Sequence, residues 1–224
     1  MKIRAVLFDL DGTLLDTAQD LAAALNVVLE EQQRSPLSFE EIRPYISHGG
    51  EALIRLGFSL SEADPAAKPL LARLVEIYAA HIADRTQPFE GMLETLTTLE
   101  QQGIYWGIVT NKLTHLTLPL LEKFEFTCHS ACNICGDTLK QKKPHPAQLL
   151  YACELMKVLP ENSVYVGDAQ RDIEAGQRAG MRTVVAAYGY FGQEDQPETW
   201  GATTTIQQPL ELLDWVNKIN NGGK

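Results

Sequence analysis

Residues 7–15 are Leu7-Phe8-Asp9-Leu10-Asp11-Gly12-Thr13-Leu14-Leu15, and they place two carboxylates directly after an apolar run. The run predicts a buried strand, so both acids fall at the carboxyl edge of a sheet, where α/β folds bind ligands. Neighbouring carboxylates repel each other and lose hydration when buried. A cation offsets that cost, and Mg²⁺ prefers such oxygen ligands. An ordinary strand-to-turn Asp-Gly would explain Asp11 and Gly12 but not Asp9.

The chain after Pro88 alternates between predicted strands and predicted helices. Apolar runs predict strands over residues 104–109, 130–135, 163–166, 183–186 and 203–206. Helical spacing of apolar residues predicts helices over 92–102, 113–123, 146–156 and 170–179, with a last helix after Pro209. This alternation, with the first strand over residues 2–8, indicates an α/β fold with a doubly wound, Rossmann-like parallel sheet.

A block of about seventy residues interrupts this rhythm after the first strand. Residues 17–33, 50–57 and the stretch after Asp64-Pro65 show helical spacing, and no strand is predicted between them. Thr17 to Asp20 is similar to a capping box that would start the first of these helices. We therefore expect residues 1–15 and 86–224 to form the Rossmann-like core and residues 16–85 to form an inserted, all-helical domain.

Composition excludes several classes of protein. The net charge of −10 argues against a nucleic-acid partner, whose phosphates such a protein would repel. An anionic substrate would need positive charge placed locally in its binding site. No segment reaches the roughly 20 apolar residues that span a bilayer, and the early strand leaves no room for a signal peptide. We expect a cytoplasmic protein without a membrane partner. A zinc site formed by Cys128, Cys132 and Cys135 with His129 fits known spacings poorly, and small buried thiols are the favoured interpretation.

Three later segments carry polar groups that suit a phosphoryl substrate. Thr110 and Asn111 follow a predicted strand and could bind phosphoryl oxygens or simply cap a helix. Lys143 precedes Pro144 in a stiff loop and could neutralise a phosphoryl charge, although a solvated basic turn is the alternative. Asp168 ends another strand, and Asp172 lies one turn into the next helix, where an acid is favourable in any case. Together these groups predict phosphoryl transfer at one sheet edge.

The sequence is similar to the haloacid dehalogenase superfamily, in its capped phosphatase branch. The family's four motifs match Asp9-Leu10-Asp11-Gly12-Thr13, Thr110-Asn111, Lys143-Pro144 and Gly167-Asp168 through Asp172. The resemblance covers nearly the whole chain and implies a Rossmann-like core with a helical cap. Two positions depart from the family pattern, Ala147 and Ala169, which puts hydrogen bonding around the motif residues in doubt.

The resemblance also implies roles for the motif residues. Asp9 attacks phosphorus to form an aspartyl-phosphate, while Asp11 protonates the leaving alkoxide and then activates water. Mg²⁺ is bound by Asp9, the backbone carbonyl of Asp11, and Asp168, and Asp172 supports its water shell. The phosphoryl oxygens are held by the remaining motif groups, Thr110, the amide of Asn111, and Lys143.

The expected substrate is a small phosphate ester. Within the branch, the chain is similar to phosphoglycolate phosphatases and to N-acetylmuramic acid 6-phosphate phosphatases of peptidoglycan recycling. Tyr188-Gly189-Tyr190 and Trp200-Gly201-Ala202 favour the second group. The cap sets specificity in such enzymes, so we expect Ser47, His48, Gly49 and Gly50 to face the substrate. Arg43 and Arg55 are further candidates, which could pair with a substrate carboxylate.

Two rival functions share these residues. A phosphomutase of the same superfamily would return the phosphoryl group to a sugar instead of water. A non-enzymatic phospho-acceptor resembling response-regulator receivers also uses acids, Thr and Lys, but such proteins are about half this length and lack a cap. The sequence is compatible with a monomer or a homodimer.

Overall fold

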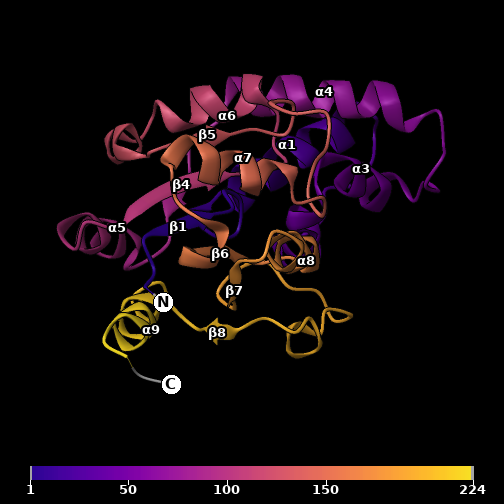
Figure 1. The fold of residues 1–224 in the computed structure, drawn as a ribbon. Helices are drawn as coiled ribbons and strands as arrows, with labels where there is room; N and C mark the ends of the chain where they lie inside the picture. Colours follow the sequence, from indigo (N-terminus) through magenta and orange to yellow (C-terminus); the bar gives the residue numbers. More distant parts are fainter. Residues whose placement is uncertain (1, 223–224) are drawn as a thin grey trace.

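A six-stranded parallel sheet forms the centre of the molecule, which confirms the predicted fold class (Figure 1). The computed structural model describes residues 2–222. The strands are arranged in the order β5-β4-β1-β6-β7-β8. Their bounds are β1 (Ala5–Phe8), β4 (Tyr105–Val109), β5 (Asn133–Ile134), β6 (Ser163–Gly167), β7 (Arg182–Ala186) and β8 (Thr204–Ile206). Strand β5 is the shortest, and it covers only part of the stretch predicted as strand.

The order of the strands reverses beside β1. The chain runs from β1 through β4 to β5 on one side and then returns to β6 on the other. Phe8 of β1 pairs with Ile108 of β4 and with Val166 of β6. In open α/β sheets, ligands bind beyond the carboxyl ends of the strands at such a reversal. Asp9 and Asp168, which follow β1 and β6, are therefore brought to this crevice.

The side chains of alternate residues of β1 are buried in two separate hydrophobic cores, one on each face of the sheet. Val6 and Phe8 belong to one hydrophobic cluster and Leu7 to another, as the two-residue period of a strand requires. Helices α5 (Met92–Gln101), α6 (Thr114–Leu121) and α9 (Glu211–Asn220) contribute to the first cluster. Helices α7 (Ala147–Met156) and α8 (Gln170–Arg178) contribute to the second. Short 3₁₀ helices complete the connections: η2 (Glu125–His129), η3 (Pro160–Asn162) and η4 (Pro197–Thr199).

The block after β1 is helical. Its elements are α1 (Ala18–Glu31), α2 (Phe39–Ile42), η1 (Arg43–His48), α3 (Gly50–Phe58) and α4 (Ala67–Ala80). Helices α1, α3 and α4 contact one another, and Figure 1 shows them grouped, in purple, on one side of the sheet. Two short antiparallel strands, β2 (Leu15–Asp16) and β3 (Gln87–Pro88), form the entrance and exit of this helical segment.

Helix α1 starts differently from the expectation for Thr17. The Thr17 side chain caps no helical N–H; its hydroxyl donates to Asp11 Oδ1 at 2.6 Å instead. The hydroxyl of Tyr190 takes the capping place, accepting from the backbone N–H of Thr17 at 2.8 Å and of Ala18 at 3.1 Å. It also donates to Asp16 Oδ1 at 2.6 Å. The predicted capping box is therefore wrong, because the hydroxyl of a residue far along the chain binds the backbone N–H groups at the start of α1.

The cysteines form no disulfide and no metal cluster within residues 2–222. Cys132, Cys135 and Cys153 are buried, and Cys128 is exposed. The favoured interpretation of buried thiols is thus confirmed for three of the four. Among the described helices, none is long and apolar enough to cross a membrane.

Candidate active site

Three carboxylates converge where β1 and β6 end. Asp9, Asp168 and Asp172 each offer an oxygen, and these oxygens lie within 4.8 Å of one another. All three residues are buried. This all-oxygen donor set suits a hard divalent cation such as Mg²⁺. The carboxylate of Asp11 is not part of the cluster, and metal binding by the Asp11 backbone carbonyl stays a prediction.

Lys143 lies against two of these acids. Its buried ammonium is 2.9 Å from Asp9 Oδ1 and 2.8 Å from Asp172 Oδ1. It also donates to Tyr165 Oη at 2.7 Å and to the carbonyl of Val109 at 3.1 Å. Lys143 and the nearby buried guanidinium of Arg171 supply two positive charges against three buried carboxylates. The cluster therefore keeps negative charge that a bound cation would offset.

The electrostatics of the cluster appear most clearly at Asp168. Burial, together with the charges of Asp172 and Asp9, raises the pKa of Asp168 to about 7. Burial also raises the pKa of Asp172, although Lys143 opposes that shift. Carboxyl groups with raised pKa values in a crevice are typical of functional sites. Here the cause is the crowding of acids in a site from which solvent is excluded.

Asp168 is held by donors from three parts of the chain. Ser47 Oγ donates to Asp168 Oδ2 at 2.6 Å, and the backbone N–H of Tyr190 donates to the same oxygen at 3.0 Å. Thr13 Oγ1 donates to Oδ1 at 3.4 Å. Ser47 belongs to η1 of the helical segment, and its carbonyl accepts from the guanidinium of Arg171. The helical segment is thereby joined directly to the carboxylate cluster.

Thr110 and Asn111 follow β4 at the same edge. Thr110 is buried, and its Oγ1 accepts from the backbone N–H of Lys112 at 3.2 Å. The side chain of Asn111 bonds twice to the backbone of Lys143, accepting from its N–H at 3.1 Å and donating to its carbonyl at 3.0 Å. Asn111 therefore fixes the loop that carries Lys143, a task that the sequence motif alone did not indicate.

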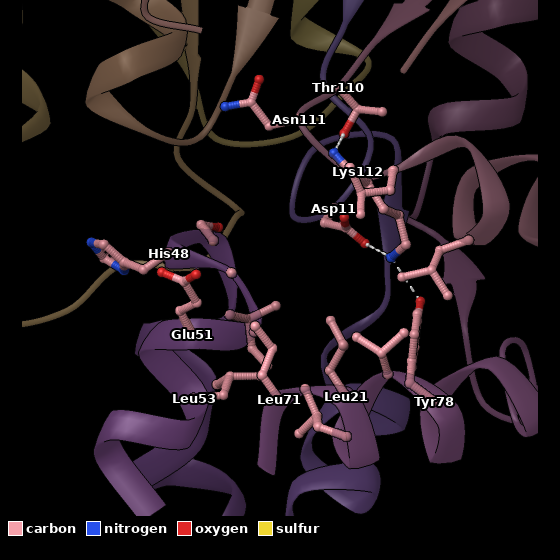
Figure 2. Close-up of a pocket in the computed structure, with 18 of the residues that line it drawn as sticks. Asp11, Leu21, His48, Glu51, Leu53, Leu71, Tyr78, Thr110, Asn111 and Lys112 are labelled. Atoms are coloured by element: carbon pink, nitrogen blue, oxygen red, sulfur yellow. Dashed lines mark hydrogen bonds and ion pairs between the residues drawn. The ribbon is translucent and has the colours of Figure 1, made fainter. Parts of the chain in front are cut away.

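The carboxylate of Asp11 lies outside the cluster and pairs with Lys112. Lys112 Nζ is 2.8 Å from Asp11 Oδ1 and donates to Tyr78 Oη at 2.8 Å, as the dashed lines in Figure 2 show. Burial alone would lower the pKa of Lys112, but Asp11 and Tyr78 raise it above its ordinary value. Neither Lys112 nor Tyr78 was singled out from the sequence, because a lysine after Thr-Asn and a tyrosine in an amphipathic helix both fit ordinary surface and core positions.

A cavity of about 580 Å³ separates this edge of the sheet from the helical segment. Asp9, Asp11, Thr110, Asn111 and Lys112 line its core side. The helical segment contributes an apolar wall with a few polar groups, formed by Leu21, Ile46, Ser47, His48, Gly49, Gly50, Glu51, Leu53, Leu71, Leu74, Val75 and Tyr78. In Figure 2, His48 and Glu51 lie across the cavity from Asp11 and Lys112. Four residues expected to face a substrate thus line the cavity: Ser47, His48, Gly49 and Gly50.

Arg43 and Arg55 do not line the cavity. The guanidinium of Arg43 donates to the carbonyl of Gly189 at 2.8 Å and lies over the ring of Tyr190. Arg55 pairs instead with the exposed Glu62 at 3.8 Å. Because the guanidinium of Arg43 faces the carbonyls of Tyr188 and Gly189, the structure does not bring it to the cavity, and its pairing with a substrate carboxylate stays a prediction. Arg171 is the guanidinium that lines the cavity.

The Tyr188-Gly189-Tyr190 stretch joins the core to the helical segment. Tyr190 binds Asp168 through its backbone N–H and caps α1 through its hydroxyl. Gly189 packs so closely on Asp168 and Gly12 that a side chain would collide with both. Tyr188 donates to the carbonyl of Thr13 at 3.1 Å. The stretch therefore holds the carboxylate cluster and the entrance of the helical segment in one arrangement.

Comparison with known proteins supplies the context for this geometry. The family model described as Haloacid dehalogenase-like hydrolase matches residues 6–186. The chain is 35% identical to an N-acetylmuramic acid 6-phosphate phosphatase of Pseudomonas aeruginosa, over 97% of this chain and 96% of that protein. It is 46% identical to a phosphoglycolate phosphatase of Xylella fastidiosa, over 92% and 90% respectively.

Solved structures show the same fold. A predicted phosphoglycolate phosphatase from Haemophilus somnus superposes with a TM-score of 0.85 at 26% identity, covering 96% of this chain and 98% of that one. A putative phosphoglycolate phosphatase from Lactobacillus delbrueckii gives a TM-score of 0.83 at 25% identity, covering 96% and 99%.

Proposed function

This chain belongs to the haloacid dehalogenase-like hydrolase family and is a phosphatase, and we propose that it hydrolyses a small phosphate ester through an aspartyl-phosphate formed on Asp9. The observation that carries the proposal is that Asp9 and Asp11 line one cavity, while Lys143 and the other acids of the carboxylate cluster are buried against Asp9. Such a site supplies a nucleophile, a proton donor and charge compensation together.

The proposed chemistry has two steps. In the first, an Asp9 oxygen attacks phosphorus, the bond from phosphorus to the ester oxygen breaks, and that oxygen takes a proton from the carboxyl group of Asp11. In the second, water attacks the aspartyl-phosphate, gives a proton to Asp11, and releases phosphate and the Asp9 carboxylate. Asp9 and Asp11 both line the cavity, as each step requires.

Mg²⁺ is the proposed cofactor. Asp9, Asp168 and the backbone carbonyl of Asp11 would hold it, with Asp172 supporting its water shell. The oxygen donor set and the raised pKa of Asp168 support this, since a cation would offset the crowded negative charge. When bound, the ion would neutralise charge on the transferring phosphoryl group.

The phosphoryl oxygens would be held by Thr110, the amide of Asn111, and Lys143. Thr110 and Asn111 line the cavity, and Lys143 lies 2.9 Å from the proposed nucleophile. An ammonium at that distance reduces the repulsion between an anionic nucleophile and an anionic substrate. The helical segment of residues 16–85 would act as the cap that closes over the leaving group and excludes water.

Among substrates, we propose N-acetylmuramic acid 6-phosphate, the substrate named for a relative that shares nearly the full length of this chain. The cavity of about 580 Å³, with its wall of aliphatic side chains, supports this choice. A sugar carrying acetyl and lactyl methyl groups could fill such a space and contact such a wall. Phosphoglycolate is the second candidate, because the Xylella fastidiosa relative with that name is more similar in sequence.

Phosphate release from both esters, measured side by side with Mg²⁺, tests the proposal. We expect a kcat/KM for N-acetylmuramic acid 6-phosphate at least about 100-fold above that for phosphoglycolate. The reverse preference would assign the chain to phosphoglycolate. Release of phosphate from neither ester, by a protein with a normal unfolding transition, would contradict both substrates. Transfer of phosphate to a second sugar hydroxyl would indicate the phosphomutase alternative. The cytoplasmic location and the monomeric or homodimeric state remain predictions.

A further inference from the structure

Lys112 occupies an unusual place for a lysine. It lines the cavity, and its side chain is only 7% exposed. Fully desolvated ammonium groups are costly unless they are paired. Here the ammonium contacts Asp11 Oδ1 at 2.8 Å and Tyr78 Oη at 2.8 Å, and it lies 4.5 Å from the centre of the Tyr78 ring. The burial of this lysine is therefore offset by one acid of the core and one tyrosine of α4.

The hydrogen bonds of Asp11 are divided unequally between its two oxygens. Lys112 Nζ and Thr17 Oγ1 both donate to Oδ1, at 2.8 Å and 2.6 Å. Within residues 2–222 no hydrogen bond to Oδ2 is formed. Two donors on Oδ1 disfavour a proton there, because a protonated oxygen would face two other hydrogens. A proton on this carboxyl group is therefore directed to Oδ2.

We propose that Lys112 is a positioning residue, which fixes Oδ1 of Asp11 so that Oδ2 presents its proton to the ester oxygen of the leaving group. The inference rests on the proposed function, in which Asp11 is the proton donor. The inference gives a role to a residue that is not among those proposed to act as nucleophile, to bind the cation or to hold the phosphoryl oxygens. A misplacement of about 1 Å at such a group can cost about 100-fold in rate.

Tyr78 extends this arrangement to the helical segment. Its hydroxyl accepts from Lys112, and its buried ring, carried by α4, lies next to Lys112 in Figure 2. The position of Lys112 thus depends on α4 being docked against the core. Tyr78 therefore links the pair of Asp11 and Lys112 to the docked position of the helical segment, in which this segment also walls the cavity.

The test uses the dependence of kcat/KM on the leaving group. This ratio reports the steps through departure of the leaving group. An alkyl phosphate needs a proton on its departing oxygen, whereas dinitrophenolate departs without one. We therefore compare Lys112→Met with the natural protein on N-acetylmuramic acid 6-phosphate and on dinitrophenyl phosphate. Phosphoglycolate replaces the sugar phosphate if it is the better substrate.

The expected result is a selective loss. For Lys112→Met, kcat/KM on the alkyl phosphate should fall by about 100-fold and on dinitrophenyl phosphate by less than about threefold. Tyr78→Phe, which keeps the ring but removes the acceptor, should show a smaller loss with the same selectivity. Lys123→Met, at an exposed lysine outside the cavity, is the matched control and should change neither value.

Equal losses on both esters for Lys112→Met and Tyr78→Phe would overturn the inference and leave Lys112 a structural residue. No loss on either ester would overturn it as well. Failure of the proposed function is recognised separately, because the natural protein would then hydrolyse no alkyl phosphate at all. If Lys112→Met does not fold, Tyr78→Phe alone decides the outcome by the same ratio.

Discussion

Replacing Tyr190 with Phe should loosen the joint between the core and the helical segment. The Tyr190 hydroxyl makes three hydrogen bonds at the entrance of α1, with the backbone N–H groups of Thr17 and Ala18 and with the carboxylate of Asp16. The phenyl ring would keep the packing of this fully buried side chain. The substitution therefore isolates the contribution of the hydroxyl.

The size of the effect follows from what each partner loses. The N–H of Ala18 keeps a second acceptor, Asp16 Oδ1 at 3.3 Å. The N–H of Thr17 keeps none within residues 2–222, and Thr17 is fully buried. An unsatisfied buried donor costs about 1–3 kcal/mol, and loss of a helix cap costs about 1 kcal/mol. Because these two costs overlap, we expect a decrease of about 2 kcal/mol in the free energy of unfolding.

Thermal and urea unfolding of the purified variant would measure this decrease. For a chain of this length, about 2 kcal/mol corresponds to a fall in Tm of about 4–8 °C. Tyr105→Phe is the matched control, because Tyr105 is 52% exposed and its Tm should be unchanged. A Tyr190→Phe variant indistinguishable from this control would refute the reasoning, since the Thr17 amide would then be satisfied without the hydroxyl.

Three further predictions concern the same region. Asp20→Ala should lower the free energy of unfolding by about 2–3 kcal/mol in urea titration, because the buried carboxylate accepts from both N–H and Oγ1 of Thr86; an unchanged midpoint would contradict this. Gly12→Ala should reduce phosphate release by about 100-fold, because the added Cβ would collide with Asp168. Gly103→Ala is the control, since Gly103 also has a positive φ but faces open space, and this variant should keep full activity. Equal losses in both variants would show that the positive φ alone causes the effect. In EDTA, the free energy of unfolding should fall as pH rises from about 4 to about 7. Burial raises the folded-state pKa of Asp168 to about 7, so in this range the folded protein retains a proton that the unfolded chain releases. Mg²⁺ should therefore raise the Tm more at pH 8 than at pH 5 in thermal scans, and an equal shift at both would contradict the assignment of Asp168.

The sequence predicts well whatever depends on local pattern. The acids after β1 and β6 lie at the sheet edge as expected, because apolar runs mark strands and parallel strands end at one edge. Thr110 and Lys143 meet them there for the same reason. The four sequence motifs predict the roles of these residues, because an acid pair, a threonine, a lysine and a further acid in this order are rare outside one family.

Contacts between the core and the helical segment are not predictable in this way. Thr17 and Tyr190 are 173 residues apart, and nothing near Thr17 indicates that a distant hydroxyl will cap its helix. In the sequence, nothing distinguishes Arg43 from an ordinary exposed arginine, because its contact with Gly189 forms only through the docking of η1 on the core. The pairing of Lys112 with Tyr78 depends on the same docking. Local propensity says nothing about how two folded parts face each other.

The central claim, that Asp9 carries the phosphoryl group, is tested most directly by trapping it. The protein would be acid-quenched during turnover of dinitrophenyl phosphate with Mg²⁺, digested, and examined by mass spectrometry, with Asp9→Asn treated identically. We predict one added phosphoryl group on the peptide that contains Asp9, and none on the corresponding peptide of Asp9→Asn. A phosphoryl group on another residue, or hydrolysis by Asp9→Asn at the natural rate, would contradict the account.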